Sequence, residues 1–447
     1  MANGVTKGPA EPRRRLKVLA LSLVALLLAI LALGLSVFGA TRSWAGTASA
    51  NTASAITASC ASVVAKPGWV GTWSASQIPA NATDALSERG FHNQTLREVV
   101  HVSLGGTRLR IRLSNQYGKS PLIVDDVHVG LSRPDGAVKE PSSRLVTFSG
   151  ASFDVINPGQ AANSDPVDLA IGNLANLAVS IYLPGLTGPT TWDSGANTTS
   201  YTSRPGNFAG TSSSSGYTSP ITAWYYLSGV DVYSPNQIGA VVALGDSITS
   251  GYNSKLDANA TWPDYLAARI DAVEPPGQRA AVLNAGLDAN QLLNGTHLGA
   301  SAEDRFGTDV GSVTGIRTVI LAEGTNDLRL DQGPHASSPL TAAELIRGMR
   351  DVVAQAHAHG LRIIGTTILP FQGDSPDYTP AAEATREAVN HWIRTSGAFN
   401  GVIDFDQALR DPADLARIRS AYGGPLHPND AGYAAMARAV NLALLCP

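Results

Sequence analysis

A chain of 447 residues is too long for one ordinary domain, so we expect two. A hydrophobic content of 44% is typical of a globular protein. The dispersed Lys and Arg residues and the formal net charge of −4 argue against nucleic acid as a partner, because a mildly acidic surface repels phosphate backbones.

Residues 1–50 have the pattern of an export segment. A basic run at residues 13–17, which resembles a twin-arginine signal, precedes an uncharged apolar run at residues 18–40. The apolar run is long enough to span a bilayer, whereas small residues at 48–50 and 53–55 offer cleavage sites. We therefore expect a secreted or extracytoplasmic protein with a cleaved signal peptide. An uncleaved anchor is the alternative, and it would be the protein's only contact with a membrane.

Residues 51–65 are rich in Ala, Ser and Thr and predict a linker. The two cysteines are Cys60, just after the export segment, and Cys446, next to the C-terminus. In an oxidising compartment we expect them to form a disulfide that joins the two ends of the exported chain, with two unrelated thiols as the alternative. Neither the cysteines nor the histidines have the spacing of metal ligands, so we expect no metal.

Residues 66–235 have the pattern of a β-sandwich domain. Residues 96–104 alternate for part of their length, and residues 108–113 alternate strictly between arginine and apolar side chains after a Gly-Gly turn signal. This pattern predicts a hairpin with one buried face. Residues 190–219, rich in Ser, Thr and Gly, predict a long loop. Further short strands are expected at residues 145–148, 167–169 and 177–183.

From residue 236 to the C-terminus, apolar runs alternate with helical patterns, as is typical of a parallel sheet covered by helices. Thr341 and Glu344 form a capping-box pattern and Gly360 can end a helix, so residues 341–359 predict a helix. Five strands of this kind predict a flavodoxin-like three-layer α/β/α domain. The expected strands are residues 241–244, 282–283, 318–321, 362–369 and 402–405.

Four short motifs stand where such a sheet places its chemistry. The motif Gly-Asp-Ser ends at Ser247 after the first strand, residues 284–290 follow the second strand, and Gly-Thr-Asn-Asp at residues 324–327 follows the third. Leu-His-Pro-Asn at residues 426–429 precedes the last helix. Because the carboxyl ends of parallel strands meet at one edge of a sheet, we expect these motifs to lie together.

The residue types predict nucleophilic catalysis. A serine hydroxyl needs a base within hydrogen-bond reach, which makes Ser247 the candidate nucleophile and His427 the candidate general base. The oxyanion formed on attack needs donors, and the backbone N–H of Ser247 and the amide of Asn326 fit that role. The alternatives are a turn residue at Asn326 and a histidine that only packs at a helix start. We expect structural roles for Asp246 and Asp327, because their carboxylates can accept hydrogen bonds from backbone N–H groups.

The order of the four motifs resembles the SGNH (GDSL-type) hydrolase family over residues 239–447. Residues 69–73 and 113–115 resemble the jelly-roll-like β-sandwich of exported bacterial members, among them esterases associated with xylan breakdown. The resemblance implies that the backbone N–H of Ala289 is a third oxyanion donor. It also implies ester chemistry without a cofactor.

The sequence departs from the family in two motifs. The family's orienting Asp lies three residues before the catalytic His, and this chain has Gly424 there. Either another acid approaches His427, or a backbone carbonyl holds the imidazole in a Ser-His dyad. The candidate orienting acids are Asp404, Asp406, Asp411 and Asp414. In the second motif, Ala289 replaces a Gly, and Asp288 brings a negative charge close to the oxyanion site.

We therefore expect an exported serine esterase, or acylhydrolase, that acts on acylated carbohydrate, small esters or lipid. Acyl transfer to another alcohol would use the same residues. The departures from the family motifs also allow an alternative. The chain would then be a cell-surface protein that binds glycan through the β-sandwich and keeps a decayed hydrolase domain. The sequence does not indicate the oligomeric state.

Overall fold

The computed structural model describes residues 65–446, except residue 297 and residues 331–339. The expected export segment, most of the linker and Cys60 lie outside the described residues, so the disulfide of Cys60 with Cys446 stays a prediction. Within the described ranges, no helix is both long and apolar enough to cross a bilayer.

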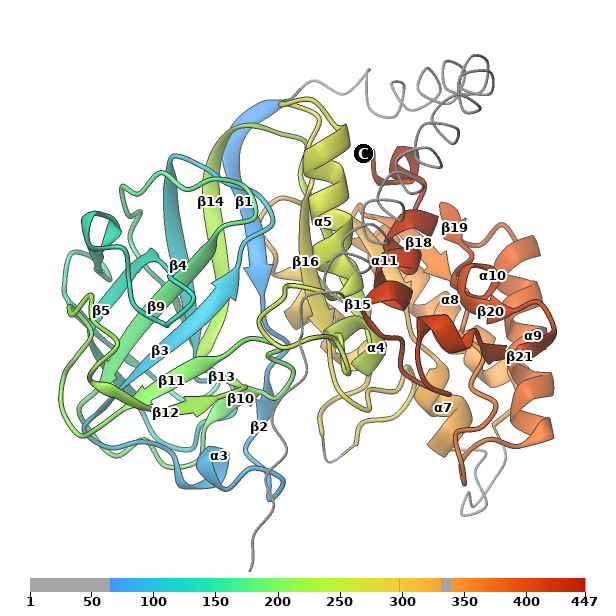
Figure 1. Cartoon of the computed structure of the whole chain (residues 1–447), viewed down its shortest axis with the longest axis horizontal. Coiled ribbons are helices and arrows are strands. Elements are labelled where there is room, and N and C mark those ends of the chain that lie inside the picture. Colours follow the sequence, from blue (N-terminus) through green and yellow to red (C-terminus); the bar gives the residue numbers. More distant parts are fainter. Residues whose placement is uncertain (1–64, 297, 331–339, 447) are drawn as a thin grey trace, which may run out of the picture. The chain divides into compact units, whose positions relative to one another are not determined.

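The carboxy-terminal domain is built on a five-stranded parallel sheet (Figure 1), as the sequence predicted. The strand order is β16-β15-β17-β18-β19, and each neighbouring pair is parallel. The strand that ends in the Gly-Asp-Ser motif, β15, lies between β16 and β17 and is buried along its whole length. The strands are β15 (Ala240–Gly245), β16 (Ala281–Gly286), β17 (Ile316–Ala322), β18 (Arg362–Thr366) and β19 (Gly401–Ile403).

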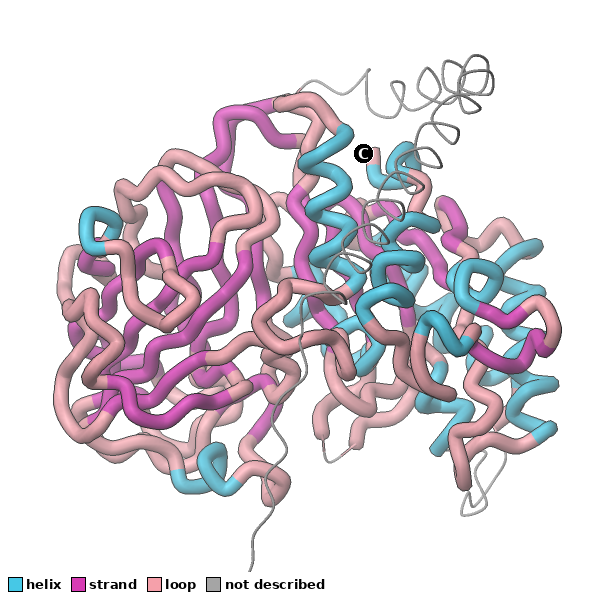
Figure 2. The backbone as a smooth tube through the Cα atoms, in the orientation of Figure 1, coloured by secondary structure: helices cyan, strands magenta, loops and turns pink. Residues whose placement is uncertain are grey.

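Side chains of the parallel sheet alternate between two apolar cores. On β15, Val241 and Ala243 join the core that contains helices α5 (Trp262–Val273) and α11 (Asp430–Ala439). Val242 and Leu244 join the core of α8 (Ala342–Ala358) and α9 (Pro380–Thr395) on the other face. This double burial explains why the strand has a continuous apolar run rather than an alternating one. Figure 2 shows the helices of this domain around its strands.

The predicted capping box is present in α8 (Ala342–Ala358). Thr341 is its N-cap, and the Thr341 and Glu344 side chains each bond the other residue's backbone N–H. The remaining helices are α9 (Pro380–Thr395) and the short α3 (Ala85–Arg89), α4 (Ser247–Ser250), α6 (Ala302–Phe306), α7 (Thr325–Leu330) and α10 (Phe405–Leu409). A two-stranded hairpin, β20 (Arg410–Asp411) with β21 (Asp414–Ile418), follows α10.

The preceding region is antiparallel and β-rich, as expected. Its two larger sheets share one apolar core, which continues into the α8 face of the parallel sheet. One sheet is β1 (Lys66–Ser74), β14 (Leu227–Gln237), β4 (Arg108–Ser114) and β8 (Ala161–Asn163). The other is β12 (Tyr217–Ile221), β11 (Ser200–Ser203), β3 (Gln94–His101), β9 (Asn176–Leu183), β5 (Leu122–Leu131), β6 (Arg144–Val146) and β7 (Phe153–Ile156). A small sheet joins β13 (Trp224–Tyr225), β10 (Thr191–Asp193) and β2 (Ile78–Pro79).

Two expectations for this region were wrong. β3 and β4 do not form a hairpin: β3 pairs with β9 and β11, whereas β4 pairs with β14 and β8. A turn signal shows only that the chain reverses, and these strands face one core from opposite sheets. The predicted loop at residues 190–219 contains β10, β11 and the start of β12. Its Ser- and Thr-rich composition hid these short strands, because strand pairing depends on partners far away in the sequence.

The antiparallel region also completes the parallel sheet. β16 is an edge strand, and its outward N–H and C=O groups need partners. The N–H of Val282 donates to Ser103 Oγ over 3.0 Å, and the carbonyl of Asn284 accepts from Ser74 Oγ over 3.3 Å. The hydroxyls of Ser74 and Ser103 thus cap the outer edge of β16. These contacts join the two regions beside the end of β15.

Candidate active site

The turn after β15 places Ser247 at the first residue of α4. Asp246 caps the helix, since its carboxylate accepts the N–H of Ile248 over 2.8 Å. The turn depends on close packing against Gly286 at the end of β16: a Cβ there would lie 2.0 Å from the backbone nitrogen of Ser250. The Ser247 side chain is therefore carried by a buried and tightly packed turn, and the residue is 8% exposed.

The structure brings Ser247 and His427 together. Ser247 Oγ lies 2.9 Å from His427 Nε2. His427 precedes α11, whose N-cap is Asn429. The Tyr252 ring packs against the imidazole with 4.5 Å between ring centroids. Burial, and then the positive charge of Arg329, lower the pKa of His427 to about 4, so the imidazole is neutral at pH 7 and can accept a proton.

None of the four acidic candidates contacts His427. Asp404 and Asp406 bind arginine side chains, Asp411 accepts a backbone N–H of its own turn, and Asp414 pairs with an arginine three residues later. These expectations are therefore wrong for this structure, because the arginines and the turn hold the carboxylates elsewhere.

A backbone carbonyl does not hold the imidazole either. In the part of the chain that the structure describes, Nδ1 of His427 has no hydrogen-bond partner, and Ser247 is the only residue that bonds the ring. Gly424, at the position of the family's Asp, donates its N–H to the carbonyl of His427. The arrangement is a serine-histidine pair without a third hydrogen-bonded member.

The three expected oxyanion donors lie on neighbouring motifs. Among the described residues, the backbone N–H groups of Ser247 and Ala289 bond no acceptor, so both can receive a ligand oxygen. Ala289 adopts φ of 54°, the left-handed conformation for which the family's Gly is suited, and alanine adopts it at a cost of about 1 kcal/mol. The Asn326 amide donates to the carbonyl of Asn290 over 2.9 Å, which leaves one N–H of Nδ2 for a second acceptor.

The two flanking acids of these motifs have structural contacts. Asp327 accepts the backbone N–H groups of Leu292 and Leu293, and so ties the third motif to the loop of the second. The Asp288 carboxylate accepts from Ser250 Oγ over 2.7 Å, and burial raises its pKa.

Sequence reasoning missed Arg305, which lies behind the site. It is 5% exposed and donates to the carbonyl oxygens of Gly245 and Ala285, each over 2.9 Å, and to Asn290 Oδ1 over 2.8 Å. It thereby joins the ends of β15 and β16 to the loop of the second motif. The charged sequence of α6 around it suggests a solvated surface, so no local signal reveals the role.

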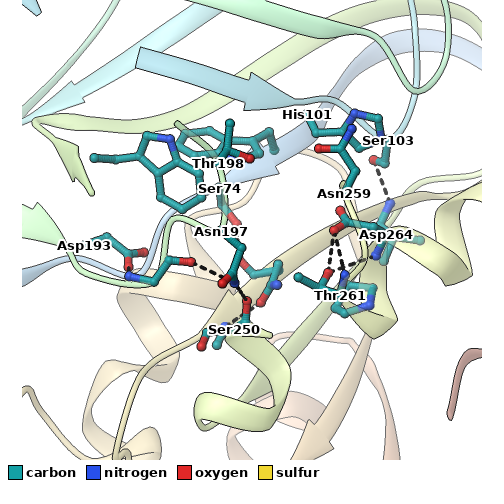
Figure 3. A pocket seen from close by; sticks show the side chains of 17 residues that line it. Ser74, His101, Ser103, Asp193, Asn197, Thr198, Ser250, Asn259, Thr261 and Asp264 are labelled. Atoms are coloured by element: carbon teal, nitrogen blue, oxygen red, sulfur yellow. Dashed lines mark hydrogen bonds between the residues drawn. The ribbon is translucent and has the colours of Figure 1, made fainter. Parts of the chain in front are cut away.

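Two of the cavities lined by described residues include Ser250, close to the Gly-Asp-Ser turn. The first, between the β-rich region and the parallel domain, holds about 60 Å³, room for a few waters. Figure 3 shows Asp193 and His101 at opposite ends of it. The second holds about 230 Å³, and its walls include Asp288 and Tyr252, the residue whose ring packs against His427. Its other walls are Ser194, Gly195, Ala196, Asn197, Thr222, Ser250 and Leu256.

Many solved structures are similar to this chain, including three bacterial proteins. A G-D-S-L family protein from Desulfitobacterium hafniense DCB-2 is 20% identical (45% of this chain, 99% of that chain, TM-score 0.34). A member of the lipolytic protein G-D-S-L family from Veillonella parvula DSM 2008 is 18% identical (45% and 94%, TM-score 0.34). A carbohydrate acetylesterase family member from Sinorhizobium meliloti is 15% identical (45% and 94%, TM-score 0.35). A comparison with curated proteins finds no significant match.

A family model matches most of the parallel-sheet region. Residues 243–435 match the model of the GDSL-like lipase/acylhydrolase family, and the match spans the motifs of Ser247, Asn326 and His427. These residues carry the parallel sheet and the serine-histidine contact described above. This part of the chain is therefore similar to the GDSL-like lipase/acylhydrolase family.

Proposed function

We propose that this protein is an exported serine esterase that hydrolyses carboxylic esters through Ser247 and His427. The observation that carries the proposal is the 2.9 Å contact between Ser247 Oγ and a neutral imidazole at the carboxyl edge of the sheet. Export rests on the basic and apolar pattern of residues 1–50.

The proposed reaction has two stages. Ser247 Oγ attacks the ester carbonyl while Nε2 of His427 takes the hydroxyl proton. The oxyanion binds the N–H groups of Ser247 and Ala289 and the free N–H of Asn326. When the intermediate collapses, the imidazolium returns the proton to the leaving alcohol and an acyl-serine remains. Water, activated by His427, then releases the acid and regenerates the serine. The scheme uses no metal or cofactor.

Because no described acid bonds His427, we expect a lower turnover. Disabling the orienting acid of a serine protease lowers kcat about 10⁴-fold, chiefly by favouring the wrong imidazole tautomer. Here the Tyr252 ring packs against the imidazole, and the fold holds it beside Ser247. Packing replaces part of the orienting role of an acid but not its stabilisation of the imidazolium, so we expect a slower enzyme than one with a full triad.

The 230 Å³ cavity beside Tyr252 favours one substrate class among the expected esters. Its walls offer hydroxyl, amide and carboxylate groups from Ser194, Asn197 and Asp288, together with the ring of Tyr252. Such walls suit the hydroxyl groups of an acylated carbohydrate better than the chain of a lipid, because a long alkyl chain cannot satisfy polar groups that it buries. We therefore propose that the alcohol part of the substrate is hydroxyl-rich.

The test is active-site labelling combined with an ester assay. A fluorophosphonate probe is expected to label the wild type at Ser247, and p-nitrophenyl acetate hydrolysis is expected to fall to the uncatalysed rate in Ser247→Ala and His427→Ala. Ser396→Ala, which removes an exposed hydroxyl outside the site, is the matched control. A wild type that is unlabelled and no faster than Ser247→Ala would contradict the proposal. Acetylated xylo-oligosaccharide against a long-chain p-nitrophenyl ester tests the preference for the alcohol.

A further inference from the structure

Arg329 lies on α7 and contacts the proposed oxyanion donor. It stands three residues after Asn326, so the two side chains share a face of the helix. Its Nη1 donates to Asn326 Oδ1 over 2.8 Å. An arginine can bond only the oxygen of an amide, because it has no acceptor. The contact fixes the oxygen side of the Asn326 amide, while the carbonyl of Asn290 accepts from its Nδ2, so the NH₂ group is directed away from the arginine.

Two carboxylates hold this arginine from the opposite side. Arg329 Nε pairs with Asp374 Oδ2 at 2.5 Å and Nη2 pairs with Asp377 Oδ2 at 2.8 Å. Both acids lie in the loop that precedes α9. Each of the three guanidinium nitrogens thus has a different partner, and the Arg329 side chain is 15% exposed. A planar fork bound at three points has a defined orientation, which it passes to the Asn326 amide.

The same group of charges lies near the proposed base. A Cβ on Gly373 would lie 3.3 Å from Pro425 Cβ, so the Asp374 loop packs against the His427 loop. Arg329 and Asp374 are the charged groups that act on the imidazole, and they act in opposite directions: Arg329 lowers the pKa of His427 and Asp374 raises it. The other groups against the ring are the Ser247 hydroxyl and the Tyr252 side chain.

We propose that Arg329, held by Asp374 and Asp377, is a positioning residue that fixes the Asn326 amide as an oxyanion donor. The Arg329–Asp374 pair also balances the charge beside an imidazole that no acid contacts. The inference rests on the proposed esterase function, and it gives the acidic loop before α9 a role in the site. Nothing in the Gly-Thr-Asn-Asp motif itself implies this arginine.

The first test measures catalysis. Arg329→Met is expected to lower kcat for p-nitrophenyl acetate about 10- to 100-fold with KM little changed, because a misplaced donor weakens transition-state rather than substrate binding. Arg329→Lys is expected to recover only part of kcat, since an ammonium group cannot bind three partners in the same plane. Arg133→Met is the control, because Arg133 forms an exposed ion pair with Asp135 in the β-rich region. An Arg329→Met kcat within about threefold of wild type would overturn the proposal.

The second test does not depend on turnover. In a Ser247→Ala background, NMR titration of the His427 imidazole is expected to shift to higher pH in Arg329→Met and to lower pH in Asp374→Asn. A merely structural role would not shift the pKa of His427 in opposite directions in the two variants. Shifts of the same sign, equal or not, would therefore overturn the proposal. Asp374→Asn keeps the side-chain shape and serves if Arg329→Met fails to fold, as judged by circular dichroism. If the wild type cleaves no ester, the proposed function fails while this titration still decides whether Arg329 and Asp374 act on His427.

Discussion

The pH dependence of hydrolysis offers a direct test of how the site works. Burial lowers the pKa of His427 from 6.5 to about 4, and only the neutral imidazole can take the proton of Ser247. The acid limb of kcat/KM is therefore expected near pH 4. At pH 5.5, more than nine-tenths of the enzyme would keep a neutral His427, whereas about one-tenth would do so with an ordinary histidine.

The assay is the rate of p-nitrophenyl acetate cleavage at substrate concentrations below KM, followed from pH 3.5 to 8 by the absorbance of released p-nitrophenol at its isosbestic wavelength. Stability must be followed in parallel, because the lowered pKa also acts on folding. The unfolded chain binds a proton at His427 below pH 6.5 and the native chain only below about pH 4, so stability falls as the pH drops through this window. Samples returned to pH 7 separate reversible titration from unfolding. A fully reversible acid limb at pH 6–7 would refute the reasoning, since it would show an imidazole with ordinary hydration.

Three substitutions test the surrounding structure. Arg305→Met is expected to cost about 3–5 kcal/mol in urea unfolding, because Asp309 and two strand-end carbonyl groups lose a buried cation, and a cost below about 1 kcal/mol would contradict the role of Arg305. Gly286→Ala is expected to lower fluorophosphonate labelling strongly, since the added Cβ would lie 2.0 Å from the nitrogen of Ser250 and displace α4; wild-type labelling would argue against that packing. Thr341→Ala removes the N-cap of α8 and is expected to cost about 1 kcal/mol with unchanged kcat, and an unchanged unfolding midpoint would contradict the cap.

Local patterns in the sequence predicted the parallel domain well. The continuous apolar run of β15 indicated a strand buried on both faces, and the structure places it inside the five-stranded sheet. The capping box of α8 depends on residues three apart, and it formed as predicted. The order of strands and helices then required the Gly-Asp-Ser and Gly-Thr-Asn-Asp motifs to reach one edge of the sheet.

The tertiary structure decided what distant segments do to one another. It separated β3 from β4 into two sheets, and used Ser74 and Ser103 to cap the edge of β16. It also engaged the candidate acids with arginines and left His427 with Ser247 as its one hydrogen-bond partner among the described residues.

The sequence by itself thus determined the elements and the motifs, because periodicity, caps and turn residues act over a few positions. It did not determine which charges surround the Asn326 amide and the imidazole. Arg305 and Arg329 reach the site only through long side chains from helices whose sequences resemble solvated surface. Burial, which lowers the pKa of His427, depends on the packing of the whole domain, so only the folded chain decides how the serine is activated.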